Sequence, residues 1–249
     1  MEWFASWFDS EYYHLLYQHR NDTEAADFIR ALHAHLQENY PALAQPAHVL
    51  DLACGKGRHT RQLAELYPQT QVLGVDLSPQ SIQTAQNEAH PQNCQFAVHD
   101  LRQPLYGEFE LIANLFTSFG YFEDEASHLL ALENMRDALA PEGVLVIDFF
   151  NARPVVRDLV LSEQKTLSGV HFGIQRRLEN GRLLKDIRVQ PLEEAPHQFR
   201  EQVWAFGLAD FERFFEKVGL RLQAVFGDYQ LRPFSESDSP RCLMLVQKK

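Results

Sequence analysis

The chain has 249 residues, a length typical of one large domain or of one core with an elaboration. Its formal net charge of −11 argues against a nucleic-acid groove as the main binding site, and 45% hydrophobic residues suffice for a filled core. No apolar run approaches the roughly 20 residues of a membrane span, and the N-terminus lacks a signal-peptide pattern. Three widely separated cysteines fit neither a zinc spacing nor a disulfide framework, so we expect reduced thiols, no metal site and a cytoplasmic protein.

The first 40 residues are expected to form two helices, of which the first is dense in aromatic side chains. Tyr13, Tyr17 and Arg20 fall on one face of that first helix, and a second helix is predicted over 23–37. Two interpretations stay open. The aromatic helix either packs on the core or forms a lid whose Tyr13 and Arg20 reach into a cleft.

From residue 47 onward, strands and helices alternate along the chain. The predicted strands are 49–52, 71–75, 95–99, 110–116 and 143–150, and the predicted helices are 59–67, 79–89 and 129–139. Alternation of this kind indicates a parallel sheet covered by helices on both faces.

After Asn151 the pattern changes to short strands with a period of two. These strands are predicted at 165–176, 182–190 and 198–206, with a hairpin turn at Asn180-Gly181. A helix over 210–218 and strands over 220–226 and 242–247 follow. The chain is thus expected to comprise an N-terminal helical lid (1–40), an α/β core (41–151 and 207–249) and an antiparallel insert (152–206), which serves as a substrate cap or a dimer interface.

Acidic residues mark the ends of the first three predicted strands. Asp51 precedes a turn that contains Gly55 and Gly57, while Asp76 and Asp100 end the second and third strands. The carboxyl ends of parallel strands line one crevice, and an acid about 20 residues beyond a glycine turn suits the hydroxyl groups of a ribose. The pattern therefore predicts a nucleotide-binding crevice, with Asp76 on the ribose.

The glycine turn differs from a dinucleotide-binding turn at two positions. Thr60 stands where a third small residue is expected, and Asp51 places a negative charge where a pyrophosphate would lie. A ligand with an ammonium and a sulfonium group suits Asp51 better, which favours S-adenosyl-L-methionine.

Three segments resemble class I S-adenosylmethionine-dependent methyltransferases: Asp51-Leu-Ala-Cys-Gly-Lys-Gly57, Val75-Asp-Leu-Ser78 and His99-Asp-Leu101. The resemblance spans about residues 47–150 and implies a doubly wound, mostly parallel, seven-stranded Rossmann-like α/β sheet that ends in a reversed hairpin. It implies that the methionine part of the cofactor is held by Asp51, Ala53, Gly55 and Gly57, and the ribose and adenine by Asp76, Leu77, Asp100 and Leu101. It also implies that Asn114 and Phe116 line the floor beside the methyl group, while Arg20 is a candidate partner for the methionine carboxylate.

The segment Asn114-Leu-Phe-Thr-Ser-Phe-Gly-Tyr-Phe122 is similar to the matching segment of small-molecule N-methyltransferases, including amino-sugar and glycine methyltransferases. The Asn-Pro-Pro-Tyr motif of amide and base N-methyltransferases is not found there, which argues against nucleobase or glutamine methylation. The resemblance implies a small-molecule acceptor, N- rather than O-methylation, and S-adenosyl-L-homocysteine as product.

Methyl transfer from a sulfonium is an in-line displacement, in which positioning and desolvation can supply most of the acceleration. Tyr121 and Tyr13 are candidates for a catalytic base, and a third candidate, His128, is expected at the surface. Tyr121 can equally be an aromatic residue that shapes the pocket. Two alternatives remain: a nucleotide-dependent oxidoreductase and a non-enzymatic S-adenosylmethionine sensor. The acceptor and the choice between monomer and homodimer stay open, and we expect no nucleic-acid or membrane partner.

Overall fold

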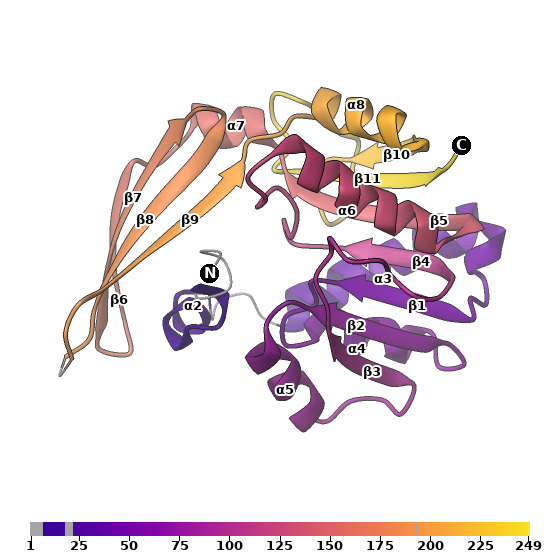
Figure 1. Ribbon diagram of the computed structural model, residues 1–249, viewed down its shortest axis with the longest axis horizontal. Helices are drawn as coiled ribbons and strands as arrows, with labels where there is room; N and C mark the ends of the chain where they lie inside the picture. Colours follow the sequence, from indigo (N-terminus) through magenta and orange to yellow (C-terminus); the bar gives the residue numbers. More distant parts are fainter. Residues whose placement is uncertain (1–6, 18–21, 193) are drawn as a thin grey trace.

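The computed structural model describes residues 7–17, 22–192 and 194–249, and its largest element is a mixed β-sheet (Figure 1). The strands of this sheet are β1 (His48–Leu52), β2 (Gln71–Asp76), β3 (Cys94–Val98), β4 (Phe109–Asn114), β5 (Leu139–Phe150), β10 (Leu220–Phe226) and β11 (Arg241–Lys248). Their order is β10-β11-β5-β4-β1-β2-β3. β1 to β5 are parallel to one another, whereas β11 is antiparallel to both β5 and β10. The predicted seven-stranded, mostly parallel sheet is therefore confirmed.

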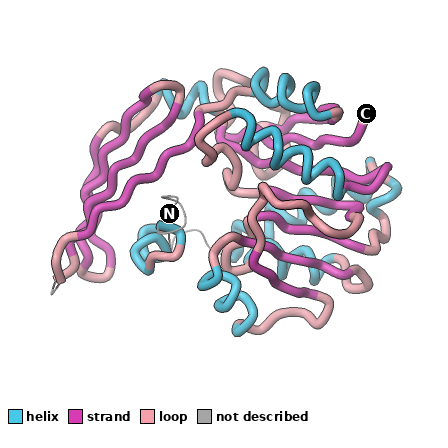
Figure 2. The backbone as a smooth tube through the Cα atoms, in the orientation of Figure 1, coloured by secondary structure: helices cyan, strands magenta, loops and turns pink. Residues whose placement is uncertain are grey.

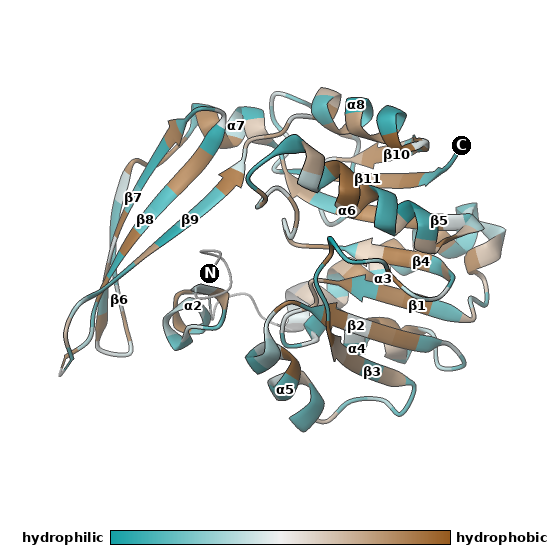
Figure 3. Ribbon diagram, in the orientation of Figure 1, coloured by the Kyte–Doolittle hydropathy of each residue, from teal (hydrophilic) through white to brown (hydrophobic). Residues whose placement is uncertain are grey.

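Helices cover both faces of this sheet. They are α3 (Asp22–Asn39), α4 (Arg58–Leu66), α5 (Pro79–Asn87), α6 (Glu125–Ala138) and α8 (Leu208–Val218), with a short 3₁₀ turn η1 (Pro41–Leu43) before β1. Successive strand residues point to opposite faces, so Val49 joins the core under α3, α4 and α5 while Leu50 joins the core under α6 and α8. Figure 3 shows the resulting concentration of hydrophobic residues in the central strands. These strands are mostly apolar because both of their faces are buried.

The insert forms a separate antiparallel sheet with the order β6-β7-β8-β9. Its strands are β6 (Ser162–Leu167), β7 (Val170–Glu179), β8 (Arg182–Gln190) and β9 (His197–Trp204), and a short helix α7 (Ala152–Arg157) precedes them. The hairpin at Asn180-Gly181 is confirmed, with both residues at positive φ. The single strand predicted over 165–176 is wrong, because the chain reverses at Ser168-Gly169, a turn without the Asn-Gly signature. The helix α7 was also not predicted.

Residues 7–17 bury their apolar side chains on the insert, whereas α3 packs on the parallel sheet. Helix α2 (Glu11–Leu16) lies beside the insert in the backbone tube of Figure 2. Trp7, Tyr12 and Leu16 bury their side chains against apolar residues of β7 and β8. Arg20 lies outside the described residues. The functional division into lid, core and cap stays a prediction.

Within the described part of the chain, no helix combines the length and the apolar character that crossing a bilayer requires.

Gly57 lies at the end of the glycine turn, where its backbone packs closely against Phe96 of β3. It ends the turn at φ +78°, and a Cβ built there would clash with the ring of Phe96. We predict that Gly57→Ala lowers the free energy of unfolding by about 2 to 4 kcal/mol, through left-handed strain and overpacking. Gly219→Ala is the matched control, because Gly219 has φ +75° but open space around its Cβ position. It should cost only about 1 kcal/mol in the same urea titration. Equal losses in the two variants would contradict a packing role for Gly57.

Candidate functional site

A cavity of about 740 Å³ opens along the carboxyl edge of the parallel strands. This volume falls within the range of small-molecule sites. Of the residues predicted from the sequence, the cavity is lined by Tyr13, Asp51, Ala53, Gly55, Asp76, Leu77, Asp100, Leu101, Phe116 and Tyr121. Gly57 and Asn114 do not line it. The fold thus brings most of the predicted set to one edge of the sheet.

The turn after β1 leaves open space above its first glycine. Ala53 and Gly55 both adopt φ +56°, and a Cβ added at Gly55 would meet no atom within 4 Å. The Gly55 amide donates a hydrogen bond of 2.8 Å to Asp76 Oδ2, which fixes the turn against the end of β2. A ligand can therefore approach the backbone at Gly55 without meeting a side chain.

Asp51 is a buried carboxyl group with one hydrogen-bond donor from a side chain. It lies within β1, has 1% of its surface exposed, and accepts a hydrogen bond of 2.6 Å from Thr60 Oγ1. Burial raises the pKa of Asp51 to about 7, against the opposing effect of the Thr60 bond. Thr60 therefore serves as a hydrogen-bond donor to Asp51. In the sequence, Thr60 was noticeable only as a departure from the pattern of a dinucleotide-binding turn.

The other two strand-end carboxyl groups differ in environment. Burial raises the pKa of Asp76, although the amides of Gly55 and Ser78 donate to its oxygens. The pKa of Asp100 is lowered because Arg102 donates hydrogen bonds to it, including one of 2.6 Å from Nη2 to Oδ2. Sequence reasoning missed Arg102, although its spacing two residues after Asp100 could have indicated a local ion pair.

The segment after β4 forms the floor of the cavity in a strained conformation. Phe116 and Thr117 both have φ +61°, which is uncommon for residues other than glycine. The Phe116 amide donates 2.8 Å to Asp148 Oδ2, and the Tyr121 hydroxyl donates 2.7 Å to the Thr117 carbonyl. Asn114 is fully buried in β4 behind this floor and donates to the Leu52 carbonyl.

Residues 7–17 and the insert close the cavity from the other side. Glu201 of β9 lines the cavity and accepts hydrogen bonds from Trp7 Nε1 at 2.6 Å and from the Tyr17 hydroxyl at 2.8 Å. Asp9 accepts a hydrogen bond from Ser78, which follows β2. Tyr13 lies in α2 and packs edge-on against Phe8, whose ring also contacts Tyr121. Glu201 could not be predicted, because the insert carries no motif.

The expected surface position of His128 is wrong. Its exposed fraction is 1%, its Nδ1 lies 2.7 Å from the Asp124 carbonyl, and its ring packs against Phe119 and Phe122. Helix α6 turns this residue toward the core, and it does not line the cavity.

Two imidazole nitrogens at the cavity have no partner within the described structure. These atoms, His59 Nε2 and His99 Nε2, are buried, and both residues line the cavity. Burial lowers the pKa of His59 to about 3, so its ring is neutral. With the carboxylates of Asp76 and Asp100 and the open backbone at Gly55, these groups fit a polar nucleoside whose amino-acid tail reaches Asp51.

Comparison with known sequences agrees with this geometry. Residues 49–143 match a family described as a methyltransferase domain. The chain is 36% identical over 101 residues to a trans-aconitate 2-methyltransferase of Deinococcus radiodurans, covering 41% of this chain and 37% of that protein. It is 29% identical over 145 residues to a dTDP-3-amino-3,6-dideoxy-α-D-glucopyranose N,N-dimethyltransferase of Streptomyces fradiae, covering 56% and 52%. The chain spans between 37% and 58% of the length of the relatives it matches.

Solved structures share the whole architecture. A methyltransferase from Clostridium acetobutylicum, described as S-adenosylmethionine-dependent, superposes with a TM-score of 0.78 at 19% identity, covering 95% of this chain and 96% of that one. A sugar N-methyltransferase from Streptoalloteichus superposes with a TM-score of 0.70 at 20% identity, covering 95% and 92%. At these identities the likeness shows a common fold.

The raised pKa of Asp51 predicts a pH-dependent affinity. Without a ligand, Asp51 is about half protonated near pH 7, because its pKa is about 7. The ammonium group of a bound ligand stabilises the ionised form of Asp51. S-adenosyl-L-homocysteine should therefore bind more tightly as the pH rises from about 6 to about 8, with release of a proton. Calorimetry in two buffers of different ionisation enthalpy measures both effects.

Asp51→Asn should remove this pH dependence. Asp100→Asn is the matched control, because the lowered pKa of Asp100 keeps that group ionised over the whole range. It should weaken binding without changing the dependence on pH. An unchanged pH dependence in Asp51→Asn would exclude Asp51 as the titrating group.

Proposed function

We propose that the chain, which contains a class I S-adenosylmethionine-dependent methyltransferase domain, transfers a methyl group from S-adenosyl-L-methionine to the nitrogen of a small-molecule acceptor. The observation that carries this proposal is the alignment of Asp51, Asp76 and Asp100 on three neighbouring parallel strands along one cavity. The match of residues 49–143 to a methyltransferase domain covers all three.

Each carboxyl group has a distinct part in holding the methyl donor. Asp76 would accept from the ribose hydroxyls, with Leu77 beside the adenine, and Asp100 would accept from the adenine amino group. Asp51, with Ala53 and Gly55 beside it, would face the cationic methionine end. When bound, the donor supplies a methyl group already activated by its positive sulfur. The protein's contribution is then to orient the acceptor and to exclude water.

The groups around the acceptor side favour a nitrogen nucleophile. A neutral amine is nucleophilic without first losing a proton, whereas a hydroxyl is a weak nucleophile until a base removes its proton. The hydroxyl proton of Tyr121 is given to the Thr117 carbonyl, and burial lowers the pKa of His14 to about 4. Both groups line the cavity, and both are poorly suited to remove a proton from a hydroxyl. Tyr121 and Tyr13 then serve best as residues that orient the acceptor.

The comparisons also favour an amine. The relative named as an amino-sugar N,N-dimethyltransferase matches 56% of the chain, while the Deinococcus trans-aconitate 2-methyltransferase matches 41%. The sugar N-methyltransferase structure superposes over 95% of the chain, a span that includes the insert. A carboxylate acceptor, which the trans-aconitate relatives suggest, is the second candidate.

Two other functions fit the structure less well. An oxidoreductase would place a pyrophosphate at the glycine turn, where Asp51 and Thr60 stand. A cofactor sensor has no need for the part of the cavity that extends to the insert and is lined by Tyr13, Tyr121 and Glu201. Whether the chain acts as a monomer or as a homodimer through the insert stays a prediction.

Loss of the ribose contact should weaken cofactor binding. We expect S-adenosyl-L-homocysteine to bind in the micromolar range, and Asp76→Ala to weaken it at least about tenfold through loss of charged hydrogen bonds. Isothermal calorimetry gives the affinities, and thermal melts check the fold. Asp137→Ala is the control, since Asp137 is exposed and pairs only with its neighbour Arg136 among the described residues. No binding to the unaltered protein, or a response to NADH by fluorescence, would refute the proposal.

An acceptor panel separates nitrogen from oxygen. Matched pairs of amines, alcohols and carboxylic acids on the same carbon frame are incubated with S-adenosyl-L-methionine, and products are identified by mass spectrometry. We expect N-methyl products, formed faster as the pH rises and the neutral amine becomes more abundant. Methyl esters or ethers without any N-methyl product would assign the reaction to oxygen.

A further inference from the structure

The strand order divides the cavity into a cofactor half and a remaining half. The groups expected to hold the cofactor lie at the ends of β3, β2 and β1, which are neighbours in the sheet. Arg241 begins β11, opposite Phe150 at the end of β5, and both residues line the cavity. β11 lies three strand spacings from β1, roughly 14 Å. Arg241 is therefore on the acceptor side.

The guanidinium of Arg241 is held in one orientation. Its Nε donates 2.8 Å to Asp148 Oδ1, its Nη2 lies 2.8 Å from the same oxygen, and Nη2 also donates 2.9 Å to Thr117 Oγ1. The guanidinium also lies over the ring of Tyr229, 5.5 Å from the centroid. An arginine fixed in this way loses little conformational entropy when it binds a ligand.

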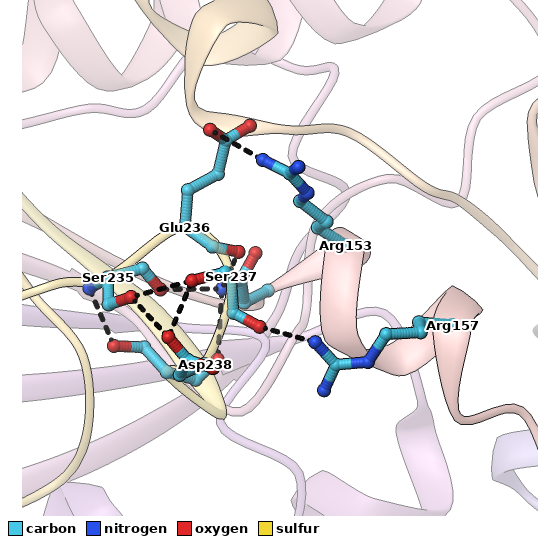
Figure 4. Close-up of polar contacts among 8 residues, drawn as sticks. Arg153, Arg157, Ser235, Glu236, Ser237 and Asp238 are labelled. Carbon is cyan, nitrogen blue, oxygen red and sulfur yellow. Dashed lines mark hydrogen bonds and ion pairs between the residues drawn. The ribbon is translucent and has the colours of Figure 1, made fainter.

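The chain before Arg241 is clamped as well. Figure 4 shows the loop over residues 235–238 held against α7, where Arg153 pairs with Glu236 at 3.3 Å and Arg157 donates 2.9 Å to the Ser237 carbonyl. Asn151 donates to three carbonyls of the same loop, those of Ser235, Glu236 and Ser239. The start of β11 is thus fixed relative to the end of β5.

Asp148 does not depend on Arg241 alone to compensate its charge. It is fully buried, and its Oδ2 accepts hydrogen bonds from the Phe116 amide at 2.8 Å and from the Tyr229 hydroxyl at 3.1 Å. These two neutral donors stabilise the carboxylate in addition to the ion pair. Asp148 is thus satisfied by Arg241 Nε and Nη2 together with these two donors, and Arg241 Nη1 is not committed to it.

Glu201, a carboxylate of β9 that also lines the cavity, is already paired. Glu201 lies 3.3 Å from Lys185 Nζ and accepts hydrogen bonds from Trp7 and Tyr17.

Arg241 Nη1 has no acceptor among the described residues, and the Arg241 side chain keeps 17% of its surface exposed. Nη1 is thus the edge of the guanidinium left to meet a ligand.

We propose that Arg241 binds an anionic group of the methyl acceptor, a carboxylate or a phosphate, through its Nη1 edge. The inference rests on the proposed function in so far as the ligand is the acceptor. It makes Arg241 a determinant of specificity: amines that carry a carboxylate or a phosphate are preferred over the same amines without one.

Two simple anions test this site. The full chain saturated with S-adenosyl-L-homocysteine is titrated at constant ionic strength with acetate, followed by saturation-transfer NMR, and with inorganic phosphate, followed by ³¹P line width. We expect millimolar binding of at least one anion, and the two titrations distinguish carboxylate from phosphate. Arg241→Gln should weaken that binding at least about tenfold while changing the affinity for S-adenosyl-L-homocysteine less than about threefold.

Two further variants keep the test interpretable. Arg213→Gln removes an arginine that pairs with Glu125 outside the cavity, and it should bind the anions as the unaltered protein does. If Arg241→Gln alone unfolds, it is replaced in the test by the double variant Asp148→Asn with Arg241→Gln. The double variant removes both charges and leaves no unpaired charge buried. Absence of anion binding to the unaltered protein, or binding that survives the loss of Arg241, would overturn the inference. If S-adenosyl-L-homocysteine does not bind, the proposed function fails, and the titration of the ligand-free protein still decides the role of Arg241.

Discussion

The burial of carboxyl groups along one edge of the sheet is the constraint around which this molecule is arranged. A buried carboxylate must be compensated by donors or charges, and the chain compensates its carboxylates unequally. Asp148 receives an arginine, an amide and a phenol, whereas Asp76 receives backbone amides and no cation from the described residues. Asp51 receives the hydroxyl and the backbone amide of Thr60, and its pKa nevertheless rises to about 7. Asp148, which is paired with a cation, shapes the floor of the cavity, whereas Asp51 is the group for which we propose a cationic ligand.

The walls of the cavity come from segments far apart in the chain. Residues 7–17 are tied to the insert by Trp7 and Tyr17 on Glu201, and to the core by Asp9 on Ser78. The cavity floor depends on β11 through Arg241 and Thr117. This wall of the cavity therefore requires that residues 7–17, the insert and the core all be folded together, while the edge that carries Asp51, Asp76 and Asp100 is built within one stretch of strands and turns.

This difference explains what could be predicted from the sequence. The parallel sheet and the edge that carries Asp51, Asp76 and Asp100 follow from local alternation and from strand ends, which sequence periodicity reports directly. The Asp148–Arg241 pair could not be predicted, because it joins two strands separated by the whole insert. Gly57 carries the glycine signature of a ligand turn, yet its space is taken by Phe96 from β3. The split of one predicted strand at Ser168-Gly169 was missed because the turn lacks its usual residues.

The position of β11 has a consequence for the synthesis of the chain. β11 follows every other strand in sequence, yet it lies between β5 and β10 inside the sheet. Until residues 241–248 leave the ribosome, β5 has an unpaired edge and β10 has no neighbour in this sheet. A nascent chain with such an edge is open to wrong pairing. Closure of the sheet therefore waits for the synthesis of β11, and it places Arg241 at the cavity at the same moment, because Arg241 is the first residue of that strand.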